Sequence, residues 1–313
     1  MKAYVLNKTG GVENLVLSEI EKPTPNADEV LVEIKAISIN PVDVKTRATQ
    51  ELLAMIVGTE PPVILGWDIA GKVVEVGKNI TRFAPGDSVF GMVNFPGEGK
   101  AYAEYVAAPA DQLAKIPPAT SFEDAAATTL APLIALQVLQ PRVKQGDRVL
   151  IHAGSGGVGH FAIQIAKHLG AYVVSTSSAK NRDFIMALGA DEHIDYEQHK
   201  FAEVVSDMDF VLDTMGADVL INSLKVVKNG GKVVSLPGPE FPPEVKPYAQ
   251  QHNIDVSFVL VESNGADMNT LKRMLEDGVL KPHVSKVFPF EQLAAAHLQL
   301  ETGRTVGKVV VTL

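Results

Sequence analysis

The sequence predicts an α/β protein in which a doubly wound parallel sheet of six strands is inserted into a β-rich, partly open barrel domain. Three observations support this prediction. Residues 1 to about 120 contain short apolar runs between prolines and glycines, the middle of the chain alternates strand-like runs with helix-prone segments, and the tail after 260 has too few strands to form its own domain. The length of 313 residues allows two domains. We therefore expect domains over 1–121 and 122–256, with 257–313 returning to the first.

The individual elements follow from local patterns. Apolar residues alternate or cluster between glycines in runs such as 29–34 and 71–77. Ser121 and Asp124 form a capping-box pattern ahead of a helix over 125–139, kinked near Pro132. The alternating elements that follow are strand 148–153, helix 157–169, strand 172–176, a helix between Ser178 as N-cap and Gly189, strands 193–195 and 210–213, helix 219–227, strands 232–236 and 254–260, helices near 269–276 and 290–301, and strand 307–313. Six strands joined by crossover helices predict the order 3-2-1-4-5-6.

A glycine-rich stretch follows the strand over 148–153. Its spacing, Gly154-x-Gly156-x-x-Gly159, is the dinucleotide pattern, and it lies between a strand and a helix as that pattern requires. Glycines permit the tight turn and the close approach of the backbone to a pyrophosphate, while free N–H groups at the helix start attract the anion. A purely structural glycine turn is the alternative. The loop residues predicted to bind a cofactor are Gly154, Ser155, Gly156, Gly157 and Val158.

Composition excludes several classes of protein. The formal net charge is −9 and no basic stripe is present, which argues against nucleic-acid binding. The absence of cysteine excludes disulfides, cysteine nucleophiles and cysteine-based zinc sites. No apolar run approaches the length of a membrane span, and the first residues contain no apolar signal core. We expect a cytoplasmic protein with neither a membrane nor a nucleic-acid partner.

The end of the second sheet strand indicates which dinucleotide binds. An NAD site places an acidic residue there for the ribose 2′-OH, and that acid would repel a 2′-phosphate. Here the strand ends without a carboxylate and offers Ser177, Ser178 and Lys180 instead. Hydroxyls and an ammonium suit a phosphate, so the sequence favours NADP(H) as cofactor. Ser178 has a second interpretation as a plain helix cap, and Lys180 as a solvated charge.

Several motifs together resemble one known family. They are residues 40–47 (NPVDVKTR), 66–71 (GWDIAG), 153–159 (AGSGGVG), 188–191 (LGAD), 213–216 (DTMG) and 303–310 (GRTVGKVV). With them the chain resembles, over nearly its whole length, the zinc-free quinone oxidoreductase and enone reductase branch of the medium-chain dehydrogenase/reductase superfamily. The resemblance implies a GroES-like catalytic domain, a Rossmann domain, an NADPH cleft between them, and frequently a homodimer built on the nucleotide domains.

The resemblance also implies roles for individual residues. Gly157 and Val158 match the pyrophosphate loop, and Tyr196 joins the two serines and Lys180 around the 2′-phosphate and adenosine. The residues matching the nicotinamide side are Thr214, Leu236, Gly238 and Phe258. Trp67 stands where the zinc enzymes of the superfamily place a metal-ligand histidine, and the eight histidines show no metal spacing, so we expect no metal.

These features predict hydride transfer from NADPH to a small quinone or α,β-unsaturated carbonyl compound. Such acceptors give delocalised anions, so a few hydrogen bonds and one proton donor replace a Lewis acid. Asn40 is the candidate hydrogen-bond donor to substrate or carboxamide, with a turn residue as the alternative. Lys45 is the candidate proton donor, with an ordinary surface lysine as the alternative. Two other interpretations stay open: a quinone reductase with single-electron character, and a catalytically idle NADPH-binding sensor or crystallin-like protein.

Overall fold

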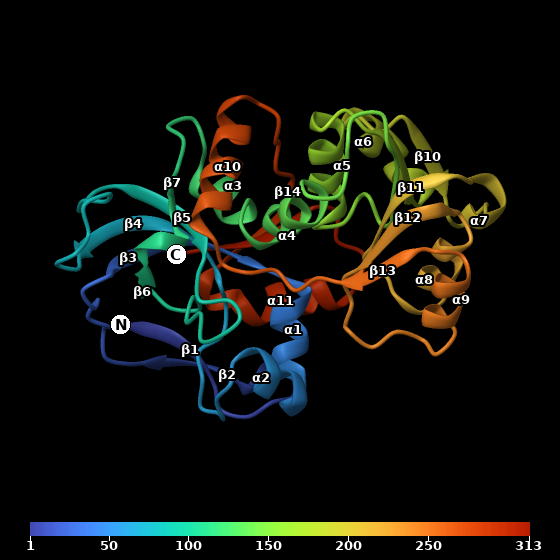
Figure 1. Cartoon of the computed structure of the whole chain (residues 1–313). Coiled ribbons are helices and arrows are strands. Elements are labelled where there is room, and N and C mark those ends of the chain that lie inside the picture. The colour runs from blue at the N-terminus through green and yellow to red at the C-terminus, as the bar shows by residue number, and fades with distance from the viewer. The chain divides into compact units, whose positions relative to one another are not determined.

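The structure, a computed structural model, describes all residues from Met1 to Leu313 (Figure 1). Its contacts divide the chain into two compact units, Met1–Leu133 with Val261–Leu313, and Ile134–Leu260. The sequence suggested boundaries after residues 121 and 256. The first observed boundary falls inside a helix, α4 (Leu130–Leu139), that is buried almost throughout. A buried continuous helix has no linker composition, which is why the sequence does not mark this position.

The second unit contains the predicted parallel sheet. Its strands are β8 (Arg148–Ile151), β9 (Tyr172–Ser177), β10 (Glu192–Asp195), β11 (Met208–Asp213), β12 (Val227–Ser235) and β13 (Asp255–Phe258). They lie in the order β10-β9-β8-β11-β12-β13, and every neighbouring pair is parallel. This is the 3-2-1-4-5-6 order of a doubly wound fold, so the fold class predicted from the sequence is confirmed.

Helices cover this sheet because its strands are apolar on both faces. The helices are α5 (Gly159–His168), α6 (Arg182–Ala187), α7 (Phe201–Val204), α8 (Ala217–Leu224) and α9 (Val245–Gln251), and Figure 1 shows α5 and α6 apart from α8 and α9 across the strands. One apolar core joins alternate residues of the strands, such as Leu150 and Val211, to Leu220 and Leu224 of α8 and Val245 of α9. Alternation along each strand leaves the intervening side chains for α5 on the other face.

The first unit is built on the long strand β3 (Glu29–Ile39). A seven-stranded sheet has the order β14-β15-β3-β4-β5-β7, and β6 pairs with β3 off this path; β1 and β2 form a separate hairpin. The other strands are β1 (Lys2–Leu6), β2 (Leu15–Glu19), β4 (Asp68–Val76), β5 (Ser88–Met92), β6 (Tyr105–Pro109), β7 (Ala114–Lys115), β14 (Val284–Pro289) and β15 (Lys308–Thr312). Because β15 pairs with β3, the tail of the chain completes the sheet begun by its first segment.

The helices of the first unit contain one departure from the sequence prediction. They are α1 (Pro41–Ala48), α2 (Gln50–Ile56), α3 (Phe122–Ala127), the first residues of α4, α10 (Gly265–Glu276) and α11 (Leu293–Glu301). Ser121 caps α3, its hydroxyl accepting from the N–H of Asp124 at 3.0 Å. The expected single helix breaks at Thr128, one turn before the proline, because the ring of Pro132 excludes the carbonyl four residues earlier.

No helix of the structure combines the length and the apolar character that crossing a membrane requires.

Candidate functional site

The predicted cofactor residues lie along one edge of the six-stranded sheet. In a parallel sheet the carboxyl ends of all strands meet at the same edge. The glycine loop follows β8, Ser178 and Lys180 follow β9, and Tyr196 follows β10. The remaining predicted residues end or follow the other three strands: Thr214 after β11, Leu236 and Gly238 after β12, and Phe258 at the end of β13. The topology therefore brings together residues that are up to 104 positions apart in sequence, Gly154 and Phe258.

The glycine loop is shaped so that only glycine fits at two positions. A Cβ on Gly154 would lie 2.0 Å from the Ser175 hydroxyl oxygen, and a Cβ on Gly159 would lie 2.3 Å from the carbonyl oxygen of Ala153. Ala153 itself adopts a left-handed conformation, with φ of 50°, to make the turn. The helix begins at Gly159 rather than at Gly157.

Two main-chain donors in this loop are available to a ligand. The N–H groups of Gly157 and Val158 make no hydrogen bond within the chain, while that of Gly156 donates to the carbonyl of Ala153 at 2.8 Å. Both free N–H groups precede the first turn of α5. An anion at this position would meet them together with the positive end of the helix dipole.

The two serines at the end of β9 are both buried, but their hydroxyls are engaged differently. Ser177 is 1% exposed, and its hydroxyl donates to the carbonyl of Ser178 at 3.0 Å and contacts Nε2 of His193 at 2.9 Å. Ser178 precedes a short 3₁₀ turn over Ala179–Asn181, but its side chain makes no capping hydrogen bond. The hydrogen of its hydroxyl and the exposed ammonium of Lys180 are therefore available to a ligand, whereas the hydroxyl hydrogen of Ser177 is already engaged.

Asn181 was not identified from the sequence. Its Nδ2 donates to the hydroxyl oxygen of Ser155 at 3.0 Å and to that of Ser178 at 3.4 Å. It therefore ties the glycine loop to the end of β9. A lone asparagine after a strand is usually a turn residue, so no local signal distinguishes it.

The edge formed by the carboxyl ends of the six strands, called the carboxyl edge below, is held in place by hydrogen bonds among buried polar groups. Asp213 is fully buried and accepts from the N–H groups of Met215 and Gly216 and, at 2.7 Å, from the hydroxyl of Ser235. Above it, the hydroxyl of Thr214 donates to the carbonyl of His152 at 3.3 Å. These bonds hold the turns after β8, β11 and β12 in fixed positions.

His152 lies in the same buried layer. Its ring nitrogens contact the hydroxyls of Thr176 at 3.2 Å and Ser223 at 2.9 Å. Burial lowers the pKa of His152 to about 4, against the opposing effect of Asp213. The ring is therefore neutral at physiological pH and acts as a structural hydrogen-bonding group.

The edge as a whole fits a phosphorylated dinucleotide. The glycine loop leaves room for a pyrophosphate against free N–H groups. The segment after β9, residues 178–181, offers a hydroxyl and an ammonium and contains no carboxylate. Tyr196 is 60% exposed and offers an aromatic face at the end of β10. Leu236, Gly238 and Phe258 are partly exposed beyond the other strands.

The two predicted catalytic residues, Asn40 and Lys45, belong to the first unit and differ in environment. Asn40 is 1% exposed; its Nδ2 donates to Asp68 Oδ2 at 2.8 Å and its Oδ1 accepts from the ammonium of Lys308. Lys45 is exposed on α1, whose buried side carries Asp43, Thr46 and Arg47. The structure therefore does not bring Asn40 and Lys45 onto one face of the helix.

Asn40 is part of a buried network of charges. Asp43 accepts from the main-chain N–H of Asn40 at 2.8 Å and from the Tyr102 hydroxyl at 2.9 Å, and Tyr102 contacts Nε2 of His297 at 2.9 Å. Burial, and secondarily the charge of Asp68, raises the pKa of Asp43 to about 7. Burial also raises the pKa of Asp68 and lowers that of Lys308, whose ammonium lies 4.0 Å from Asp68.

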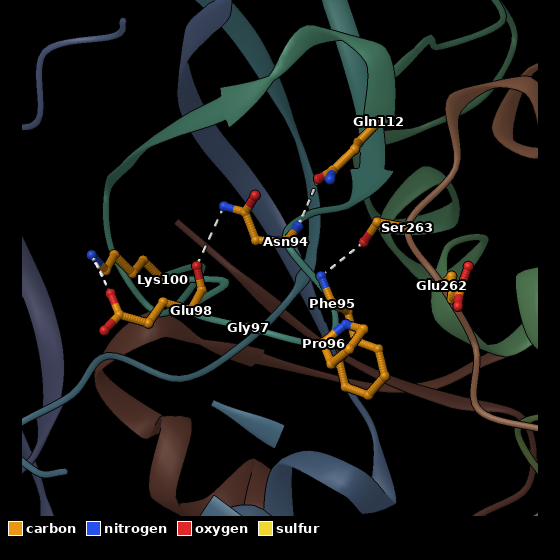
Figure 2. Close-up of a pocket in the computed structure, with 9 residues that line it drawn as sticks. All are labelled: Asn94, Phe95, Pro96, Gly97, Glu98, Lys100, Gln112, Glu262 and Ser263. Carbon is orange, nitrogen blue, oxygen red and sulfur yellow. Dashed lines mark hydrogen bonds and ion pairs between the residues drawn. The ribbon is translucent and has the colours of Figure 1, made fainter. Parts of the chain in front are cut away.

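A pocket of about 620 Å³ lies elsewhere in the first unit (Figure 2). Its wall is the loop after β5 together with the segment before α10, and Figure 2 shows the N–H of Phe95 donating to the hydroxyl of Ser263 at 2.9 Å. Behind it, the fully buried Trp67 donates from Nε1 to the carbonyl of Gly97 at 2.8 Å and packs edge-on against Phe95. The pocket is polar and was not indicated by any motif. No group of three or more His, Asp or Glu side chains in the structure is arranged to hold a metal ion.

Comparison with known proteins gives matches over the whole chain. Residues 26–118 match the alcohol dehydrogenase GroES-like domain family, and residues 188–311 match the zinc-binding dehydrogenase family. The 2-methylene-furan-3-one reductase of Solanum lycopersicum is 36% identical, covering 99% of this chain and 79% of that protein. The chloroplastic NADPH-dependent alkenal/one oxidoreductase of Arabidopsis thaliana is 35% identical with the same coverages. The solved structure of the quinone oxidoreductase from Coxiella burnetii superposes with a TM-score of 0.93 at 36% identity, covering 100% of this chain and 99% of that one.

Proposed function

Because the chain belongs to the quinone oxidoreductase and enone reductase branch of the medium-chain dehydrogenase/reductase superfamily, we propose that its carboxyl-edge site works as that of an NADPH-dependent reductase. The protein is an oxidoreductase that uses NADPH to transfer hydride to quinones or α,β-unsaturated carbonyl compounds. The observation that carries the site assignment is the edge itself: free N–H groups after β8 and hydroxyl and ammonium donors after β9, with no carboxylate among them.

In this proposal each group at the edge has a defined task. The N–H groups of Gly157 and Val158 bind the pyrophosphate, and Ser178 with Lys180 binds the 2′-phosphate. Tyr196, exposed at the end of β10, would contact the adenosine. The partly exposed residues after β11, β12 and β13 surround the nicotinamide and exclude water from it: Thr214, Leu236, Gly238 and Phe258. When bound, NADPH supplies the hydride.

Two residues of the first unit are proposed to serve the acceptor. Lys45 has an exposed ammonium that offers a proton and a positive charge to an enolate or hydroquinone anion. Asn40 already uses one N–H and one carbonyl lone pair within the buried network. Its fixed amide keeps one further N–H hydrogen, and in the proposal this hydrogen is the donor toward substrate or carboxamide.

The proposed reaction needs no metal ion. Hydride delivered to a conjugated acceptor gives a delocalised anion, which one ammonium and a few hydrogen bonds stabilise. Trp67, which stands where the zinc enzymes of the superfamily place a ligand histidine, has no lone pair to offer, and its indole N–H is bonded to Gly97. Activity that survives dialysis against a chelator supports this part of the proposal, and activity that returns only with added zinc refutes it.

We also propose a homodimer joined through β13. This strand is the outer one of its sheet and pairs only with β12. The N–H and C=O groups of its other edge are available to a second copy, and Leu260 just beyond it is 39% exposed. Light scattering of the intact protein is expected to give twice the mass of one chain, and the mass of a single chain would refute the proposed dimer. A cytoplasmic location remains a prediction from composition.

The decisive experiment follows NADPH absorbance against a panel of enals, enones and quinones, with their saturated analogues as controls. Consumption with conjugated acceptors only supports the proposed function. Tight NADPH binding without turnover of any acceptor would favour the catalytically idle alternative. Failure to bind NADPH at all would reject the assignment of the carboxyl edge.

A further inference from the structure

The amide of Asn181 lies between two serine hydroxyls that belong to different loops. Ser155 is part of the glycine loop after β8, and Ser178 follows β9. Both hydroxyl oxygens accept from the same nitrogen, Nδ2 of Asn181, at 3.0 Å and 3.4 Å. The main-chain N–H of Asn181 also donates to the carbonyl of Ser178 at 3.0 Å, which fixes the asparagine relative to that serine.

This arrangement determines what the two serines can offer a ligand. A serine hydroxyl has one hydrogen and two lone pairs, and it rotates to suit its neighbours. Here one lone pair of each oxygen is occupied by Asn181, and neither hydroxyl hydrogen is used within the chain. Each hydroxyl can therefore turn its hydrogen toward an incoming anion without losing its bond to Asn181.

The residues next to Asn181 in sequence include two exposed cations. The side chains of Lys180 and Arg182, on either side of Asn181, are exposed, that of Arg182 to 64%. The nearest acid in sequence, Asp183, is 99% exposed and lies 3.7 Å from Arg182.

We propose that Asn181 is a positioning residue for phosphate recognition, which orients the hydroxyls of Ser155 and Ser178 as donors toward the phosphates of NADPH and thereby contributes to the preference for NADPH over NADH. The inference rests on the proposed function, since it assigns the cofactor to this edge. It adds that the pyrophosphate loop and the 2′-phosphate site are coupled through one amide.

Replacement of the amide by a carboxylate provides the sharpest test. In Asn181→Asp the carboxylate accepts from both serines, so each hydroxyl hydrogen turns inward, and a negative charge is added beside the phosphate. Asn222→Asp is the matched control, because it makes the same chemical change on α8, where Asn222 bonds only to neighbours on its own helix and to Lys225. Asn181→Ala removes the orienting bonds without adding charge.

Calorimetry would measure the affinity of each variant for NADPH, NADH and 2′,5′-ADP, with thermal melting as the check on folding. Asn181→Asp is expected to lose at least about tenfold in affinity for NADPH and 2′,5′-ADP, the effect of one charge-assisted hydrogen bond. It is expected to lose less toward NADH, which has the pyrophosphate near Ser155 but no 2′-phosphate near Ser178. Asn181→Ala is expected to lose a few-fold in the same direction. Equal losses for NADPH and NADH, or losses equal to those of the Asn222→Asp control, would overturn the inference.

A double-mutant cycle with Ser178→Ala tests whether Asn181 acts through that serine. If it does, the loss of NADPH affinity in the double variant is smaller than the combined single losses, because the second change removes an interaction that is already gone. Independent losses would show that Asn181 does not orient Ser178. If the unaltered protein binds neither coenzyme, the proposed function fails; if it binds NADPH and Asn181→Asp binds it equally well, only the present inference fails.

Discussion

Replacement of Asp43 by asparagine is expected to remove a pH dependence of stability that this carboxyl group creates. Asp43 is fully buried, and burial with the neighbouring charge of Asp68 raises its pKa to about 7, while the hydrogen bond from Tyr102 acts in the opposite direction. In the unfolded chain the group has its ordinary pKa near 3.8. Between these two values the folded protein holds a proton that the unfolded chain has released. The free energy of unfolding therefore falls as the pH rises through this window.

The magnitude follows from the size of the shift. Each unit of pKa difference corresponds to about 1.4 kcal/mol, so Asp43 makes the folded protein less stable by about 3 kcal/mol as the pH rises from 5 to 8. Asparagine cannot ionise and keeps the shape of the protonated acid. Its oxygen can accept from the N–H of Asn40, and its NH₂ can donate to Tyr102 if that hydroxyl turns toward His297. The stability of Asp43→Asn relative to the unaltered protein is therefore expected to rise by about 3 kcal/mol over the same pH range.

Urea denaturation at several pH values, followed by tryptophan fluorescence, is the appropriate assay. Trp67 is the only tryptophan, is fully buried, and adjoins Asp68, so its emission reports the unfolding of the first unit. Burial lowers the pKa values of His152 and His297 to about 4 and about 3, and these groups favour the folded protein as the pH rises toward neutrality. They are present in both proteins and cancel in the comparison. If the difference in free energy of unfolding between Asp43→Asn and the unaltered protein stays constant from pH 5 to pH 8, the reasoning is refuted.

Three further predictions concern the carboxyl edge and the acceptor. Gly159→Ala is expected to lower the free energies of unfolding and of NADPH binding by about 2 kcal/mol or more, because the new Cβ would lie 2.3 Å from a main-chain oxygen. Gly238→Ala is the control: nothing lies within 4 Å of its Cβ, so it is expected to have the melting temperature of the unaltered protein. Ser178→Asp is expected to reverse the coenzyme preference in kcat/KM by placing a carboxylate beside the 2′-phosphate; continued preference for NADPH would count against that site. Lys45→Ala is expected to lower kcat about 10²-fold with NADPH affinity and melting temperature unchanged, and an unaltered kcat would remove Lys45 from the mechanism.

Patterns between neighbouring residues were enough to predict the parts of the molecule that obey local rules. The apolar run before Gly154 and the spacing of the three glycines specified a strand, a tight turn and a helix, because backbone geometry there depends on adjacent side chains. The alternation of such strands with crossover helices indicated a doubly wound parallel sheet, whose usual strand order 3-2-1-4-5-6 is the one observed. The resemblance of separate motifs added the roles proposed for the edge residues. The local pattern at Pro132 located the helix break less accurately, because the helix breaks one turn earlier than expected.

The tertiary structure alone decided which polar groups are buried together. Lys308 reaches Asn40 across 268 positions of sequence, and His297 reaches Tyr102 across 195, and no local pattern marks either pair. The pKa of Asp43 depends on this burial, because the cost of a charge is set by how far the surrounding fold excludes water. Asn181 likewise acquires its two serine partners only when β8 and β9 lie side by side. The backbone conformation of a turn or helix start depends mainly on residues close in sequence, whereas the pKa of a buried group depends on residues that are close only in the folded structure.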